Sequence, residues 1–386
     1  MFNTNTIGSF ESNFIEEIAE DISNKLNELA QLTAVPYPVG IESRVLELNK
    51  LLSRGSSDVC VVGILGIGGI GKTTIARAIY SQLRREFPRS CFLENVRETS
   101  KRPNGLIILQ KQILFDIHVK YNRKITRVDQ GTAVLKNSAW YKRVFLVLDD
   151  VDHRDQLDKL AIRRDYFELG SIIIITTRDK SMLKWAKVKE DKIYMPPALD
   201  CHESIKLFNW HAFGKGHPNE DYVKFSEKVI FHAGGVPLAL KVLGSNLSDR
   251  SKDEWERTLK KLEVKSHEDI QEKLKVSYCS LSDTQKELFL DLACFFVGME
   301  KNYAFKLLTE SNSFLESELG VLVQRCLVTI DCSNRLTMHD IIRDMGREVA
   351  LRERNRLWNH KHVLDVLEHH KVRFRCSTTY VDLITI

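Results

Sequence analysis

Five short apolar runs, separated by helical patterns, constrain the fold of the first half of this 386-residue chain most strongly. The runs are rich in β-branched residues and occupy residues 59–65, 90–93, 144–148, 172–175 and 193–195. Strands that are apolar throughout are typical of a parallel sheet covered by helices on both faces. The alternation therefore predicts a doubly wound α/β domain. After Pro196 only helical periodicity recurs for more than a hundred residues.

Changes in pattern along the chain predict five segments. Residues 1–35 form an amphipathic linker helix, because apolar residues recur there at three- and four-residue intervals. Residues 36–195 form the α/β domain and residues 196–266 a helical bundle. Residues 267–352 end in a predicted β-hairpin followed by a helix, which indicates a winged-helix domain. Residues 353–386 are expected to be a linker with a divergent tail.

Composition narrows the class of protein. The formal net charge is +5, which is too small over this length to indicate a nucleic-acid or membrane surface by itself. No apolar run reaches the ~18 residues of a membrane-spanning helix, and the first residues lack a signal-peptide pattern. The eight cysteines contain no Cys-x-x-Cys pair, so we expect buried free thiols. Together these features predict a soluble intracellular protein without a membrane partner, in the cytoplasm or the nucleus.

Residues 66–73 satisfy the spacing of a phosphate-binding loop, Gly-x-x-x-x-Gly-Lys-Thr, directly after the first predicted strand. Glycines let successive backbone N–H groups turn toward phosphate oxygens, and the following helix adds the positive end of its dipole. Lys72 is predicted to reach the β- and γ-phosphates, and the Thr73 hydroxyl is a predicted Mg²⁺ ligand. The predicted phosphate-binding residues are Gly68, Gly69, Ile70, Gly71, Lys72, Thr73 and Thr74.

The same glycines also fit the Gly-x-Gly-x-x-Gly pattern of a dinucleotide-binding turn. Glu94 even lies near the distance at which a ribose-binding acid is expected. The Lys72 and Thr73 pair argues against this alternative, because a pyrophosphate-binding turn has no use for it. The sequence therefore favours a nucleoside triphosphate site.

Two acids and an arginine complete the predicted site. Asp149 and Asp150 follow four apolar residues, where a triphosphate site needs an acid that holds the metal. Asp149 is predicted to bind Mg²⁺ through its hydration shell, and Asp150 to orient the attacking water. Fast ring ATPases usually have Glu at the second position, so the shorter Asp predicts slow hydrolysis at most. Arg178 follows the next strand. It is predicted either to bind the γ-phosphate or to cap the following helix through solvent.

Further motifs resemble the NB-ARC nucleotide-binding module of plant intracellular immune receptors, over about residues 37–351. They include residues 176–178 (Thr-Thr-Arg), residues 234–240 with Pro237, and the triplet of Met338, His339 and Asp340. Residues 92–97 and 289–296 resemble the subclass with an N-terminal TIR domain. Residues 38–44 look like the segment whose backbone cradles adenine, so Val39 and Ile41 are candidate adenine contacts.

The resemblance implies a switch in defence signalling. It implies that ADP holds the module closed, and that exchange for ATP opens it and drives self-association, with other copies or with a related full-length receptor. By analogy Pro237 would pack on the adenine or ribose. Without the resemblance, capping of the next helix would be the simpler explanation of His339. With the surrounding motifs intact, contact with the β-phosphate of ADP is favoured. The chain shows neither a TIR domain nor leucine-rich repeats, and we expect a shortened receptor.

The main alternative is a DNA-binding regulator that uses the predicted winged helix. That function would require basic residues on one exposed face of the helix after Met338. Acidic residues alternate with Arg343 and Arg347 there, which makes a nucleic-acid partner unlikely on sequence grounds. A housekeeping ATPase would need an efficient water-activating Glu and an arginine finger, and neither is evident.

Overall fold

The computed structural model describes residues 37–52, 58–87, 89–119, 125–139, 143–218, 220–263, 270–308, 314–353 and 356. The chain forms two compact units, which divide between Pro197 and Ala198. The helix expected within residues 1–35 and the expected tail beyond residue 356 lie outside the described residues.

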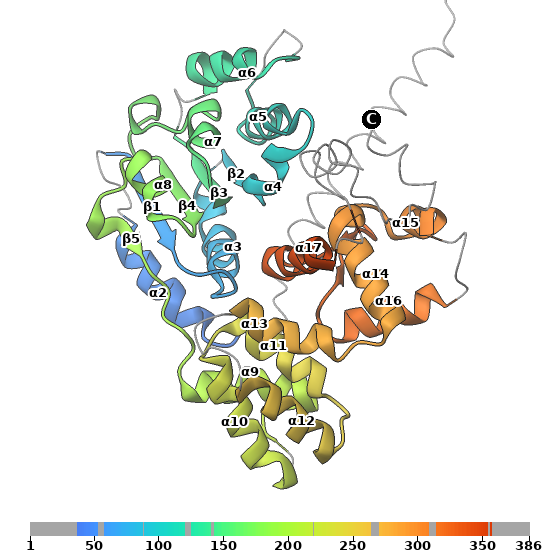
Figure 1. Ribbon diagram of the computed structural model, residues 1–386. Coiled ribbons are helices and arrows are strands. Elements are labelled where there is room, and N and C mark those ends of the chain that lie inside the picture. The colour runs from blue at the N-terminus through green and yellow to red at the C-terminus, as the bar shows by residue number, and fades with distance from the viewer. Residues whose placement is uncertain are drawn as a thin grey trace, which may run out of the picture. The chain divides into compact units, whose positions relative to one another are not determined.

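The first unit is built on a five-stranded sheet in which every pairing is parallel (Figure 1). The strands are β1 (Cys60–Leu65), β2 (Ser90–Leu93), β3 (Phe145–Val151), β4 (Ile172–Thr177) and β5 (Ile193–Tyr194). Their order across the sheet is β2-β3-β4-β1-β5. This arrangement confirms the predicted doubly wound domain.

Helices cover both faces of this sheet because its strands are apolar on both faces. They are α2 (Ile41–Leu51), α3 (Lys72–Leu83), α4 (Val96–Lys101), α5 (Gly105–Asp116), α6 (Val128–Val134), α7 (Arg154–Lys159) and α8 (Lys180–Trp185). Phe145 and Val147 of β3 pack into a core with α2 and α3. Leu146 and Leu148 point the other way, into a core that includes α5, α7 and α8.

The second unit is mainly helical in its described part. Its helices are α9 (Cys201–Phe213), α10 (Val223–Ala233), α11 (Pro237–Leu247), α12 (Lys252–Glu263), α13 (Ile270–Cys279), α14 (Asp283–Asp291), α15 (Lys301–Leu308), α16 (Leu315–Gln324) and α17 (Asp340–Glu353). Leu292–Phe296 continues α14 as a π-helical turn. Trp255 of α12 is almost fully buried against Phe208 and Phe213 of α9, which anchors the N-terminal part of the unit.

The predicted β-hairpin before α17 is confirmed, although its strands are short. β6 (Thr329–Ile330) and β7 (Leu336–Thr337) pair antiparallel. The Asp331 carboxylate accepts hydrogen bonds from the backbone N–H groups of Ser333 and Arg335, and Asn334 adopts a left-handed conformation. Side-chain capping of this kind stabilises the turn locally.

The cysteines are free thiols throughout the described part of the chain, as expected, but only some are buried. Cys60, Cys91 and Cys294 lie in the cores, whereas Cys201, Cys279 and Cys332 are exposed, so the expectation of burial was wrong for these three. Among the described helices, none has the length and apolar character that crossing a membrane requires.

Candidate nucleotide-binding site

The phosphate loop connects β1 to the N-terminus of α3, at the carboxyl edge of the sheet (Figure 1). Gly69 and Gly71 have φ angles of 78° and 98°, in the left-handed region where an L side chain is strained. These two glycines turn the loop directly into α3, while the Ile70 side chain is buried and anchors it. The loop and the first turn of α3 together form the kind of backbone cradle that suits phosphate.

The Lys72 ammonium group lies against this loop. Its Nζ donates hydrogen bonds to the carbonyl oxygens of Gly66 at 2.8 Å and Ile67 at 2.9 Å. Burial is the main cause that lowers the pKa of Lys72 to about 8, and the charge of Arg178 lowers it further. The Asp150 carboxylate partly opposes this shift. A polyphosphate beside Lys72 would supply the negative charge that a buried ammonium group needs.

Asp149 is buried on β3, with 1% of its surface exposed. Its Oδ1 accepts hydrogen bonds from the Thr73 hydroxyl at 2.8 Å and from the Thr176 hydroxyl at 2.7 Å. Burial raises the pKa of this carboxyl, and the two hydroxyl donors only partly offset the effect. The structure therefore brings together the two predicted metal ligands, Thr73 and Asp149.

These oxygens fit Mg²⁺, which takes hard oxygen ligands and retains several waters. Burial disfavours the charged form of Asp149, so a cation next to it would relieve an existing electrostatic cost. Within the described ranges, no group of three or more His, Cys, Asp and Glu could hold a metal without further ligands. A metal here would therefore be held by Thr73, Asp149 and the nucleotide phosphates.

A β-bulge places Asp150, and sequence reasoning missed the threonines that stabilise it. β3 runs to Val151, three residues beyond the predicted end, because one extra residue is inserted opposite β4 between Leu148 and Val151. Asp150 has a φ angle of 56° and donates its N–H to the Thr176 hydroxyl at 2.8 Å. The Thr177 hydroxyl donates to Val151 O at 2.6 Å. The two hydroxyls thus replace ladder hydrogen bonds that the bulge removes.

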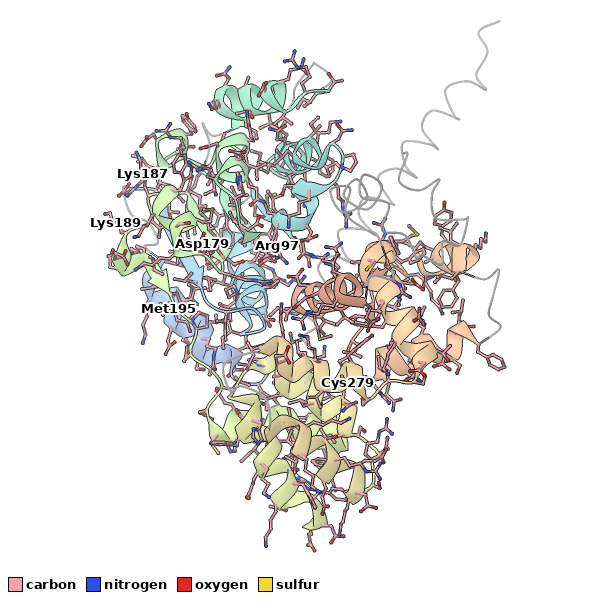
Figure 2. The ribbon with its side chains drawn as sticks, viewed as in Figure 1. Arg97, Asp179, Lys187, Lys189, Met195 and Cys279 are labelled. Carbon is pink, nitrogen blue, oxygen red and sulfur yellow. The ribbon has the colours of Figure 1, made fainter. Side chains whose placement is uncertain are left out.

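The Asp150 carboxylate is held by two arginines. Arg97 Nε lies 2.9 Å from Asp150 Oδ2, and Arg178 Nε lies 3.6 Å from Oδ1. Arg97 follows β2 at the start of α4, and Figure 2 labels it there. Arg178 does not cap α8, since Asp179 does so by accepting from Ser181 N at 2.7 Å.

Arg97 was not among the predicted site residues. The available signal was that it is the first basic residue after β2, the strand next to β3. The charges of Arg97 and Arg178 both act on Lys72, so these three cations lie together with Asp149 and Asp150 at the carboxyl edge of the sheet.

The candidate adenine segment is tied to the end of the first unit by Arg44, which closes that segment but was not among the predicted contact residues. Val39 and Ile41 flank Gly40, which begins α2 in a left-handed conformation with a φ angle of 69°. The buried Arg44 side chain donates to Gly40 O at 2.7 Å and to Pro197 O at 3.3 Å. Arg44 thereby fixes the turn that carries Val39 and Ile41.

Two predicted site residues belong to the second unit. Pro237 is the first residue of α11. Gly235, two residues earlier, takes a φ angle of 68°, and its carbonyl accepts from Leu199 N. His339 is exposed, and its Nδ1 accepts from Ile341 N at 3.2 Å, so it caps α17. The capping explanation of His339 therefore describes its local contact.

The arginines of α17 bear on the DNA-binding alternative. Arg343 is buried, with 5% of its surface exposed, and Arg347 Nε donates to Ala293 O at 3.2 Å. Arg352 pairs with Glu348 on the same helix. These contacts lie within the second unit itself, so the structure gives a DNA-reading helix no specific support.

The order of the strands excludes the dinucleotide-binding alternative. A dinucleotide-binding sheet places its second strand beside the first, so that the ribose-binding acid lies next to the glycine turn. Here β3 and β4 separate β2 from β1. Glu94, at the end of β2, instead forms an ion pair with Arg77 of α3.

Comparison with known proteins agrees with this geometry. Residues 41–217 match the NB-ARC domain family, and residues 282–354 match the winged-helix domain of Roq1-like disease resistance proteins. Disease resistance protein RUN1 of Vitis rotundifolia is 40% identical over 97% of this chain and 28% of its own length. TMV resistance protein N of Nicotiana glutinosa is 39% identical over 92% of this chain and 31% of its own length.

The chain thus spans about three-tenths of the length of these relatives. A solved STAND protein with a tetratricopeptide repeat sensor, from Pyrococcus horikoshii, superposes with a TM-score of 0.44. The two chains are 17% identical, and the match covers 86% of this chain and 45% of the STAND protein. The sequence matches and the parallel sheet with its phosphate loop lead to one conclusion: the chain carries the NB-ARC module and the winged-helix domain of plant disease resistance proteins.

Proposed function

We propose that the chain is an ADP/ATP-dependent switch in plant defence signalling, in which ADP stabilises a closed state and ATP an open, self-associating state. The observation that carries the proposal is the pairing of Asp150 with Arg97 and Arg178. A carboxylate that orients an attacking water must be available to that water. With both guanidinium groups in contact, Asp150 is poorly placed for hydrolysis, which suits a switch with slow turnover.

The arginines also explain how two nucleotide states would differ. A guanidinium group binds phosphate oxygens as readily as carboxylate oxygens. A γ-phosphate would compete with Asp150 for Arg178, whereas a diphosphate leaves this ion pair intact. A ligand contact that exists in one state only is what shifts the balance between two states.

Residues of the second unit would couple its position to the nucleotide. In the proposed closed state His339 contacts the β-phosphate of ADP and Pro237 packs on the adenine or ribose. Val39 and Ile41 support the adenine from the first unit, and Mg²⁺ is held by Thr73 and Asp149. The metal would neutralise phosphate charge, while Lys72 binds and orients the β-phosphate.

The nucleotide that co-purifies with the full chain tests the proposal. Denaturation and chromatography should release ADP in near-stoichiometric amount from the wild type and from a matched surface control, Lys111→Ala. Lys72→Ala should release little or none, because it removes the ammonium group at the β-phosphate. Release of a nicotinamide dinucleotide would contradict the assignment, and so would equal amounts of ADP from Lys72→Ala and Lys111→Ala.

A second experiment addresses the coupling between nucleotide and assembly. Light scattering after size exclusion should show a monomer with ADP and a larger species with a slowly hydrolysed ATP analogue. The same monomeric mass in both nucleotides would show that this chain binds nucleotide without switching its assembly state.

A further inference from the structure

A cavity of about 170 Å³ opens at the amino edge of the sheet in the first unit. Its floor includes Val59, Cys60 and Val61, all buried. β1 has six residues, each advancing ~3.3 Å, so the cavity lies roughly 17 Å from the phosphate loop at the other end of the strand. It is therefore separate from the nucleotide site.

The register of the sheet explains why this cavity exists. β5 pairs with β1 only at Gly63 and Ile64. Residues 60–62 of β1 pair with β4 on one side, and β5 begins too late to cover their other side. The chain that leads into β5 passes outside this uncovered edge and brings its lysines to the rim.

The walls of the cavity carry a surplus of positive charge. Arg164, Lys187, Lys189 and Lys192 line it together with one acid, Asp58, so four cations face one anion and leave a net charge of +3. Arg164 forms an ion pair with Asp58. Its hydrogen bond is the main cause that lowers the pKa of Asp58, and the charge of Lys189 adds to the effect. Lys189 is therefore close enough to Asp58 to interact with its carboxylate electrostatically.

The two lysines at the rim are exposed and available for a ligand. Figure 2 labels Lys187 and Lys189 on the outer side of the first unit, away from Arg97. In the part of the chain that the structure describes, no ion pair or hydrogen bond of their ammonium groups was found. Lys192, in contrast, donates its Nζ to Leu51 O at 2.6 Å.

Lys187 is held at this place by a strained backbone. Lys187 lies two residues after the end of α8 with a φ angle of 54°, a conformation that glycine usually supplies just after a helix. Lys187 N donates to Lys184 O, and Val188 N donates to Leu183 O at 2.9 Å.

We propose that this cavity binds inorganic phosphate, with Arg164 and the rim lysines as cationic ligands and Asp58 as the acceptor of the phosphate proton. A space of about 170 Å³ is ample for an ion of the size of phosphate. Ligands of nucleotide size need roughly 300 Å³ or more. Hydrogen phosphate has an O–H that a carboxylate can accept, whereas sulfate offers no proton and is repelled by Asp58.

Calorimetric titration of the full chain with phosphate, at constant ionic strength and with saturating ADP, tests the proposal. A repeat in the Lys72→Ala background excludes binding at the phosphate loop. We expect one phosphate per chain and sulfate binding at least tenfold weaker. Asp58→Asn should abolish this preference, because an amide can also donate to sulfate.

Lys187→Ser combined with Lys189→Ser should weaken phosphate binding at least tenfold. A matched variant, Lys111→Ser with Lys224→Ser, removes two exposed lysines elsewhere and should change affinity less than twofold. Thermal melting verifies that each variant is folded. Equal binding of phosphate and sulfate, or an affinity that the rim variant leaves unchanged, would show diffuse surface attraction and overturn the proposal. Glycerol phosphate binding as tightly as phosphate would assign the cavity to a phosphomonoester instead.

Discussion

Nucleotide affinity should fall steeply between pH 7 and pH 9 because of Lys72. Its pKa of about 8 in the folded protein means that the ammonium group loses its proton within this range. Bound polyphosphate stabilises the charged form, so binding requires a proton that is increasingly absent above pH 8. If the pKa in the complex lies well above 9, the affinity for ADP decreases about tenfold from pH 7 to pH 9.

The stability of the nucleotide-free protein should move in the opposite direction. A lysine whose pKa is lowered on folding binds fewer protons in the folded state than in the unfolded state. The free energy of unfolding therefore rises with pH between about 8 and the ordinary value of 10.5. Relative to Lys72→Met, the wild type should gain about 1.4 kcal/mol between pH 7 and pH 9. That gain corresponds to roughly 3–5 °C in Tm for a unit of this size.

Two assays separate Lys72 from other titrating groups. Equilibrium binding of a fluorescent ADP analogue gives the Kd at each pH. Calorimetry in two buffers of different ionisation enthalpy counts protons, and about three-quarters of a proton should be taken up per ADP at pH 8.5. Lys72→Arg stays charged throughout, so any binding that it retains should have a flat pH profile.

A constant Kd from pH 7 to pH 9 without proton uptake would refute this reasoning. It would mean that Lys72 keeps its proton without nucleotide, or that its ammonium group does not meet the phosphates.

Three further contacts that the structure revealed can be tested by substitution. Arg97→Met and Asp150→Asn, alone and combined, should show a coupling of about 1–3 kcal/mol in urea denaturation, and additive effects would mean that the ion pair contributes nothing. Thr176→Val leaves the Asp150 N–H without its acceptor and removes one of the two hydroxyl donors to Asp149, so it should cost about 1–3 kcal/mol, while Thr176→Ser should be tolerated. Equal stability of these two would show that the hydroxyl is unimportant. Arg356→Met removes a buried guanidinium group that pairs with Asp291 and the exposed Glu287 of α14, and should cost about 1.5–3 kcal/mol in the same assay. The exposed pair of Arg352 serves as control, and Arg352→Met should stay within about 0.5 kcal/mol.

Local patterns in the sequence were sufficient to predict the sheet and the central part of the site. Apolar runs identify buried strands because both faces of a parallel sheet are covered. The glycines and Lys72 predict a phosphate loop because left-handed φ angles and a helix N-terminus are properties of a few consecutive residues. Asp149 was predictable for a similar reason, since an acid directly after a buried strand must emerge at the edge of the sheet.

The contacts that distinguish this site join residues far apart in the sequence. Arg97 meets Asp150, and Arg44 binds the carbonyl of Pro197. Such pairs depend on which strands are neighbours, and the order β2-β3-β4-β1-β5 is not encoded in any single segment. The bulge that turns Asp150 requires the Thr176 hydroxyl on another strand.

The basic cavity has the same physical origin. It forms because β5 pairs with β1 only at Gly63 and Ile64, which leaves the first three residues of β1 uncovered on that side. The register between two strands is set by the packing of the whole sheet.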